Sequence, residues 1–308
     1  VGLGVDVNTN SGVVHVHSDD ELTAALAAVA RARVSATSRA VAATAGGTIV
    51  VAAGEYRHPL ELTTAHSGVT LEGDRDGDGE AVLSGAHVVR GAVGITLRRL
   101  ALVAASPTAP AVMVVGANGL EVDDCRVAGG IKVHGGIGNR VHHSQISNAG
   151  GGHCVWIAVC GNMSQVPWVP CNTSIDNNVI TDCINRTGGP YAPGSAGVLL
   201  GCTNGVTVAH NHILRTYSWG VRLNNNDYCP TVLNTVRLNR IEQVGQLDGD
   251  GACLYTYGHW FSPGNVFEYN HCNGGPICFY VDDGSSGQTF HGNICQDVVG
   301  NVMKVNGG

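Results

Sequence analysis

Short apolar patterns recur along the chain with an asparagine at a fixed place. The pattern apolar-x-x-Asn-x-apolar occurs five times, and its asparagines are Asn178, Asn211, Asn239, Asn270 and Asn293. Three earlier copies, between residues 97 and 146, keep the apolar frame without the asparagine. Successive copies start 19 to 34 residues apart, a spacing typical of a solenoid that repeats one structural unit per turn.

A second short apolar segment follows each of the five copies, at residues 197–200, 220–223, 252–255, 277–280 and 302–305. No amphipathic helices of the kind that build helical solenoids are visible. We therefore predict an all-β fold, a right-handed parallel β-helix with two or three short strands per turn. Neighbouring turns lie about 4.8 Å apart, so we expect the asparagines to stack as a ladder. Because asparagine tolerates the left-handed conformation, we place them in the turn itself.

The N-terminal residues 1–46 differ from this pattern and predict a capping helix. Ser18 and Glu21 have the spacing of a capping box, and Leu22, Leu26 and Val29 share one helix face. Such a helix would cover the open end of the solenoid and prevent edge pairing. We assign the remaining residues, 47–308, to the β-helix and expect it to continue beyond the last residue.

Composition narrows the function classes. The net charge is -7 and the pI is near 6.0, which argues against a nucleic-acid partner because nothing would neutralise a phosphate backbone. No apolar stretch approaches the ~20 residues of a membrane span. The chain starts without Met and ends within the repeat pattern, so we expect a processed or truncated piece of a longer polypeptide.

Cysteines and glycosylation signals predict secretion. Eleven cysteines indicate an oxidising compartment, and Asn162, Asn172 and Asn185 are N-glycosylation acceptors clustered among four of them. The alternative is a cytosolic protein with buried free cysteines. Because the count is odd, at least one thiol has no partner within the chain.

The late cysteines suggest specific pairs. Cys253 and Cys278 occupy the same inward position in neighbouring turns, as do Cys272 and Cys295, and stacked turns bring Cα atoms within disulfide range. The alternative is a column of small buried side chains. The long insertion between residues 147 and 174 contains three further cysteines, and we expect a disulfide bond to hold it in place. A zinc site is not favoured, since no C-x2-C pair is present.

Four carboxylates gather late in the chain. Asp248 and Asp250 precede one predicted strand, and Asp282 and Asp283 follow the next. Glycoside hydrolysis needs one carboxylic acid and one carboxylate, about 5 Å apart for retention and roughly 6.5 to 9.5 Å for inversion. Asp250 precedes its strand and Asp282 follows the neighbouring one, so the distance between their carboxyl groups would exceed both ranges. Asp282 and Asp283 do not easily form the pair either, because adjacent residues of a strand point to opposite faces. The alternative is that these acids cap Asp-Gly turns.

Three stretches resemble known β-helix proteins. Residues 47–56 resemble the opening strand of the pectate-lyase-like superfamily, and residues 250–256 and 280–287 resemble glycoside hydrolases, in particular family 141. The second resemblance covers roughly residues 206–308. It implies hydrolysis of a cell-wall or algal polysaccharide, with Asp250 and either Asp282 or Asp283 as acid and nucleophile or base.

Residues that would bind a sugar surround these acids. The aromatic candidates for stacking on pyranose rings are Trp219, Tyr257, His259 and Trp260. Arg222 and Lys304 are expected to point outward on their strands, where they would pair with uronate or sulfate. Together with Asp248, these residues form the predicted substrate-binding set. A solvated surface lysine is the simpler interpretation of Lys304.

Two other functions remain open. Some β-helix lyases remove the proton beside a uronate with a Lys or Arg base, a role open to Lys304 or Arg222. A non-catalytic extracellular scaffold, fibre or adhesin, with oligomeric assembly, fits the cysteines and the glycosylation signals. In all three interpretations the partner is a polysaccharide or glycan.

One acidic segment resembles a calcium-binding loop. Asp74, Asp76 and Asp78 begin like a calcium loop, but Gly85 stands where the bidentate glutamate is expected. A β-turn insertion explains the segment as well, so calcium is a secondary expectation and no other cofactor is predicted. Four histidines, His134, His142, His143 and His153, lie in Gly-rich turns without metal-ligand spacing.

Overall fold

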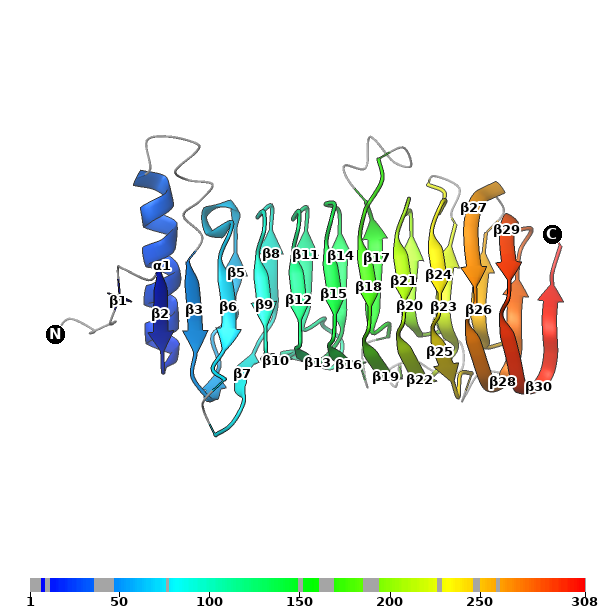
Figure 1. Ribbon diagram of the computed structural model, residues 1–308, viewed down its shortest axis with the longest axis horizontal. Coiled ribbons are helices and arrows are strands. Elements are labelled where there is room, and N and C mark those ends of the chain that lie inside the picture. Colours follow the sequence, from blue (N-terminus) through cyan, green and yellow to red (C-terminus); the bar gives the residue numbers. More distant parts are fainter. Residues whose placement is uncertain are drawn as a thin grey trace.

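The chain winds into a parallel β-helix, with a helix at its N-terminal end (Figure 1). The computed structural model describes residues 7–8, 12–35, 47–75, 78–148, 152–160, 169–184, 194–225, 229–245, 250–258 and 261–307. The all-β prediction is confirmed. Among the described residues the strand pairings are parallel apart from one antiparallel pair at the N-terminus. Each full turn contributes three short strands, one to each of three faces.

The first face is a 12-stranded sheet. Its strands, in spatial order, are β1 (Val7–Asn8), β2 (Val13–Val16), β3 (Thr48–Val51), β6 (Thr70–Gly73), β9 (Thr96–Arg98), β12 (Glu121–Asp123), β15 (Arg140–His142), β18 (Ser174–Asp176), β21 (Thr207–Ala209), β24 (Thr235–Arg237), β27 (Phe261–Glu268) and β29 (Ser286–His291).

The second and third faces are two parallel ladders, which the long strands β28 (His271–Val281) and β30 (Ile294–Val305) join into one sheet. The second face contains β4 (Gly54–Tyr56), β7 (Ala81–Ser84), β10 (Leu100–Val103), β13 (Arg126–Ala128), β16 (Gln145–Asn148), β19 (Val179–Cys183), β22 (His212–Thr216) and β25 (Arg240–Glu242). The third face contains β5 (Glu61–Leu62), β8 (His87–Arg90), β11 (Val112–Val115), β14 (Ile131–His134), β17 (Val155–Val159), β20 (Ala196–Gly201), β23 (Trp219–Asn224) and β26 (Ala252–Tyr257).

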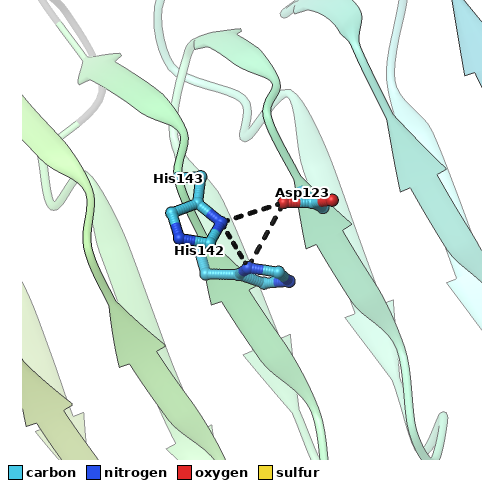
Figure 2. A group of neighbouring side chains, drawn as sticks. All are labelled: Asp123, His142 and His143. Carbon is cyan, nitrogen blue, oxygen red and sulfur yellow. Dashed lines mark hydrogen bonds and ion pairs between the residues drawn. The ribbon is translucent and has the colours of Figure 1, made fainter.

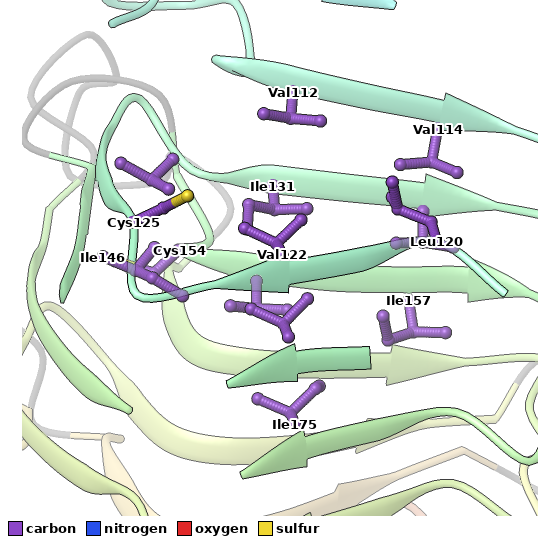
Figure 3. Close-up of a cluster of buried hydrophobic side chains, with 14 of the residues drawn as sticks. Val112, Val114, Leu120, Val122, Cys125, Ile131, Ile146, Cys154, Ile157 and Ile175 are labelled. Atoms are coloured by element: carbon purple, nitrogen blue, oxygen red, sulfur yellow. The ribbon is translucent and has the colours of Figure 1, made fainter. Parts of the chain in front are cut away.

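The interior is a set of stacked apolar columns (Figure 3). On the first face, Val122 pairs with Val141, which in turn pairs with Ile175, and all three are at most 1% exposed. Alternate strand residues point to opposite faces, so the apolar residue of each copy of the repeat faces inward. At the C-terminal end the same column continues with Phe267 and Phe290, whose rings stack with centroids 4.8 Å apart.

The predicted asparagine ladder is confirmed. The side-chain amide of each asparagine donates to the Oδ1 atom of the next, at 2.9 to 3.0 Å, from Asn178 to Asn293. The placement of the asparagines in the left-handed conformation is wrong. The preceding residue takes the positive φ, as at His210 (57°) and Leu238 (54°), because that residue turns the corner while the asparagine side chain points inward to the ladder.

The N-terminal helix, α1 (Asp19–Ser35), forms as predicted. The backbone N–H of Glu21 donates to the Ser18 hydroxyl at 3.3 Å. The Glu21 carboxylate accepts a bond from the backbone N–H of His17, one residue before the expected position. Leu22 is 1% exposed and packs with the core. A short 3-10 helix, η1 (Thr64–His66), contacts α1. Within the described residues, no helix has the length and apolarity to cross a membrane.

Five disulfides link the turns and loops, and the predicted pairing of the late cysteines is wrong. Cys253 is bonded to Cys272 and Cys278 to Cys295, with Cα atoms 6.0 and 6.1 Å apart. Each bond joins the third face of one turn to the second face of the next, because these sulfurs point across the interior rather than along their columns. The remaining disulfides are Cys154–Cys183, Cys160–Cys171 and Cys202–Cys229.

The unpaired thiol is Cys125, which gives a direct test of the connectivity. Its side chain lies in the core, and burial raises the pKa of the thiol to about 12. We expect the folded protein to be inert to a thiol reagent at pH 8, since the thiolate is the reactive form. Unfolding without a reductant is expected to release one thiol per chain, measured by reaction with a chromogenic disulfide reagent. Three or more reactive thiols would contradict the five bonds.

Candidate functional site

The outer side of the third face carries a continuous column of large side chains. The parallel register aligns one outward position on each successive strand. From β11 to β30 that position is occupied by Met113, Lys132, Trp156, Leu199, Arg222, Tyr255, Tyr280 and Lys304. Neighbouring members are about 4.8 Å apart along the axis, so the column forms an extended aromatic and cationic stripe.

A glycine in β23 allows two residues of this strand to reach the outer side together. A Cβ at Gly220 would lie 2.4 Å from Cγ2 of Ile241, so this position faces the interior and has no room for a side chain. Val221 also faces the interior, where it is fully buried. Trp219 and Arg222 therefore lie on the same outer side although they are three residues apart.

Aromatic rings enclose the Arg222 guanidinium. Its Cζ lies 4.1 Å from the ring centroid of Trp219 and 5.3 Å from those of Tyr255 and Tyr257. Burial lowers the pKa of Arg222, although nearby tyrosines oppose the shift. Within the described part of the chain, the buried Nε of Arg222 and Nε1 of Trp219 have no hydrogen-bond acceptor. Most buried N–H groups have an acceptor, so these two are exceptions.

Asp282 is held as a carboxylate beside this cluster. The Tyr255 hydroxyl donates to Oδ2 at 2.7 Å, while the Asn306 amide and the Asp283 backbone N–H donate to Oδ1 at 2.9 and 3.0 Å. Burial alone would raise the pKa of Asp282, but these bonds and one from Tyr280 leave it below the ordinary value. Asp282 is 7% exposed, so it is a buried and fully hydrogen-bonded anion.

Asp250 connects to the same network through Lys304. The Lys304 Nζ lies 3.1 Å from Asp250 Oδ1 and 4.2 Å from the ring centroid of Tyr280. Hydrogen bonding to Tyr280 and Asp250 raises the pKa of Lys304. Both Asp250 and Asp282 act electrostatically on Tyr280. Tyr280 thus lies between two of the three predicted catalytic carboxylates.

The other predicted site residues are only partly described. Asp283 has a positive φ of 49° and interacts with the Tyr257 hydroxyl, whose pKa is raised first by burial and then by this carboxylate. The remaining members of the set, Asp248, His259 and Trp260, lie outside the described residues. The Trp219 ring is 7% exposed, so its faces contact Arg222 and Tyr255 rather than solvent.

The other sequence-based sites remain predictions. Asn172 is exposed at a described position, whereas Asn162 and Asn185 lie outside the described residues. The expected calcium loop is incomplete in the same way, because Asp76 is not among the described residues. Asp74 and Asp78 are described, but nothing tests calcium there.

A pocket at the other end of the stripe was not predicted. It has a volume of about 380 Å³, and Lys132, His153 and Trp156 supply its polar and aromatic walls. The Lys132 Nζ lies 3.7 Å from the Trp156 ring centroid. Burial, with Arg222 and Lys132 nearby, lowers the pKa of His153 to about 3, so this imidazole is neutral at pH 7. No local sequence pattern predicts this pocket, because the residues of its walls come from different turns.

Two histidines that the sequence assigned to turns meet a carboxylate on the first face. His142 and His143 converge on Asp123, each with Nδ1 3.2 Å from Oδ1 of the carboxylate. This group and the stripe lie on different faces of the solenoid. Among the residues that the structure describes, these three side chains have ligand atoms close enough together to hold a metal ion.

Comparisons with known proteins place the fold. No family model matches the chain, and no curated protein matches it by sequence. The solved structure of DFA-IIIase from Arthrobacter chlorophenolicus A6 in complex with GF2 is similar, with a TM-score of 0.59 over 94% of this chain and 88% of that one. The chain is a right-handed parallel β-helix.

A second similar structure is the Dettilon tailspike protein, with a TM-score of 0.52 over 94% of this chain and 69% of that one. Sequence identity is 12% in both comparisons. At this identity the similarity establishes the fold alone.

Proposed function

We propose that this chain is a carbohydrate-active β-helix that binds an acidic polysaccharide along the outer stripe of the third face. The observation that carries the proposal is the stripe itself, which runs parallel to the solenoid axis. Lys132, Arg222 and Lys304 lie at every third turn, about 14 Å apart along the axis. An extended polymer with repeated negative groups matches such a spacing.

The chemistry at Arg222 supports an acidic sugar. A guanidinium binds carboxylate and sulfate oxygens with paired, directional hydrogen bonds. The pocket of Lys132, His153 and Trp156 would hold one sugar unit, since its volume is within the range of small-ligand sites.

Hydrolysis is the reaction we propose for this site. Asp282 is held ionised, as a base or nucleophile requires. The resemblance to family 141 glycoside hydrolases implies Asp250 and either Asp282 or Asp283, and it leaves the acid role to Asp250, which would have to leave its ion pair with Lys304 to carry the proton. A lyase with Lys304 as its base is less favoured, because the raised pKa of Lys304 keeps this amine protonated and unable to act as a base. Secretion is part of the proposal and is supported by the five disulfides.

Binding to polygalacturonate, compared with an uncharged glucan, tests the proposal. We expect calorimetry to show binding to the acidic polymer alone, weakening as salt rises because the contacts are ionic. Lys132→Gln and Lys304→Gln are each expected to reduce the affinity about five-fold or more, since charge-assisted hydrogen bonds contribute about 1 kcal/mol or more. Reducing ends are counted in the same incubations, and hydrolysis would create them without the near-ultraviolet absorbance of an elimination product.

Arg237→Gln is the matched control, because Arg237 is an exposed cation on the first face. It should bind as the unmodified protein does. Equal losses in all three variants would indicate nonspecific charge attraction and contradict the stripe as the binding site. Binding without new reducing ends would remove the hydrolase assignment and leave the non-catalytic scaffold or adhesin.

A further inference from the structure

Three nitrogen and oxygen atoms form a small triangle on the outer side of the first face (Figure 2). Nδ1 of His142 lies 2.9 Å from Nδ1 of His143, and each lies 3.2 Å from Oδ1 of Asp123. The register pairs Asp123 of β12 directly with His142 of β15. His143 has a positive φ of 49° at the following corner, and its ring turns back toward the other two.

The surrounding contacts orient the atoms of the triangle. Nε2 of His142 lies 2.9 Å from a carboxylate oxygen of Glu121, and this contact holds the ring with Nδ1 directed at Asp123. The two imidazoles and the carboxylate therefore each present one ligand atom to a common point.

The distances within the triangle suit a metal ion. Zinc and related ions bind imidazole nitrogen and carboxylate oxygen at about 2.0 to 2.2 Å. Two ligands at right angles around such an ion are about 3.0 Å apart, by that bond length. The three edges, 2.9, 3.2 and 3.2 Å, match one triangular face of an octahedron. Two histidines and one carboxylate on such a face are a recurrent ligand set for divalent first-row metals, with open positions opposite.

We propose that Asp123, His142 and His143 bind a divalent first-row transition metal ion. Outer contacts orient the ligands as in known metal sites. Glu121 holds the His142 ring, and Nε of Arg98 donates to the second oxygen of Asp123 at 2.9 Å. His142 is 5% exposed, whereas the His143 side chain is 56% exposed. An ion can therefore enter from the His143 side.

Cobalt binding to the tag-free protein tests the site. The chain is treated with a chelator, freed of it, and titrated with Co²⁺ by calorimetry and by visible absorption. We expect one ion per chain, with the weak visible bands of an octahedral Co²⁺ ion. His143→Asn is expected to weaken binding at least ten-fold, because loss of an outer contact alone costs about that much. Asn177 shows that asparagine is accepted at the equivalent corner.

His210→Asn is the matched control, because His210 is an exposed histidine with the same positive φ at a corner two turns along. It should bind Co²⁺ as the unmodified protein does. Asp123→Asn should lose binding in parallel with His143→Asn, and a melting curve without metal shows whether both variants are folded. Failure of the unmodified protein to bind Co²⁺, or equal binding by His143→Asn, would overturn the site. Neither outcome bears on polysaccharide binding by the third face.

Discussion

Asn239→Ala is expected to lower the free energy of unfolding by about 4 kcal/mol. This figure follows from a cost of about 1 to 3 kcal/mol for each buried polar group that is left unpaired. Asn239 is 2% exposed and stands in the middle of the ladder. Its amide donates to the Val208 carbonyl and to Asn270 Oδ1, and its Oδ1 accepts from the backbone N–H and the amide of Asn211. Alanine removes all four bonds and leaves Asn211 with two N–H groups that lack an acceptor, one in its backbone and one in its amide, which keeps only the Ile175 carbonyl. Asn270 Oδ1 still accepts from the backbone N–H of residue 239.

Urea unfolding followed by far-ultraviolet circular dichroism measures this loss. Asn301→Ala is the control, because Asn301 is exposed on β30 and outside the ladder, and a change within about 0.5 kcal/mol is expected there. Asn293→Ala should give an intermediate loss, since the ladder ends at Asn293 with one asparagine partner. Equal stability of all three variants would contradict a cooperative ladder.

The ladder also shows how far the sequence determines the fold. The asparagine and its apolar flanks recur at fixed spacing, so the stacking direction and the inward residues are predictable. A second ladder, in which Asn234 donates to Asn265 Oδ1 at 3.0 Å, was missed. Its asparagines lie two residues before the inward residues Val236 and Phe267. Two copies are too few to separate from chance without the register.

Disulfide pairing depends on distances across the interior rather than along a column. Stacked positions are the neighbours that a repeat predicts, so Cys253 was paired with Cys278. The bonds instead join the third face of one turn to the second face of the next, and Cys154–Cys183 repeats this geometry. The inward direction of each sulfur decides the bond, and the linear pattern does not contain that direction.

The candidate sites are predictable only where a local pattern, such as acids at the ends of predicted strands, marks their residues. The late acids and Lys304 were found because they flank strands of consecutive turns. Asp123 and His142 are 19 residues apart, a spacing set by the shortest turn in the chain, and they meet only because β12 and β15 pair in register. No local motif records such a contact.

Tyr255→Phe is expected to lower the free energy of unfolding at pH 7 by about 2 kcal/mol, the usual contribution of a hydrogen bond to a charged group. The hydroxyl is the donor at 2.7 Å to Oδ2 of Asp282, and both residues are buried. Tyr269→Phe is the control, because Tyr269 is 53% exposed and its hydroxyl contacts the exposed His291. A change within about 0.5 kcal/mol is expected for the control.

The pH dependence separates an ionised Asp282 from a neutral one. Its folded pKa lies below the unfolded value of about 3.9, so ionisation contributes stability that is complete above that value and is lost as pH falls through the folded pKa. The loss in Asp282→Asn, measured by urea unfolding, should therefore be constant from pH 5 to 7 and shrink below about pH 4. A loss that is the same at pH 3 and pH 7 would mean that the carboxylate is not held ionised. The base or nucleophile role proposed for Asp282 would then lose its physical basis, whereas polysaccharide binding by Lys132, Arg222 and Lys304 would be unaffected.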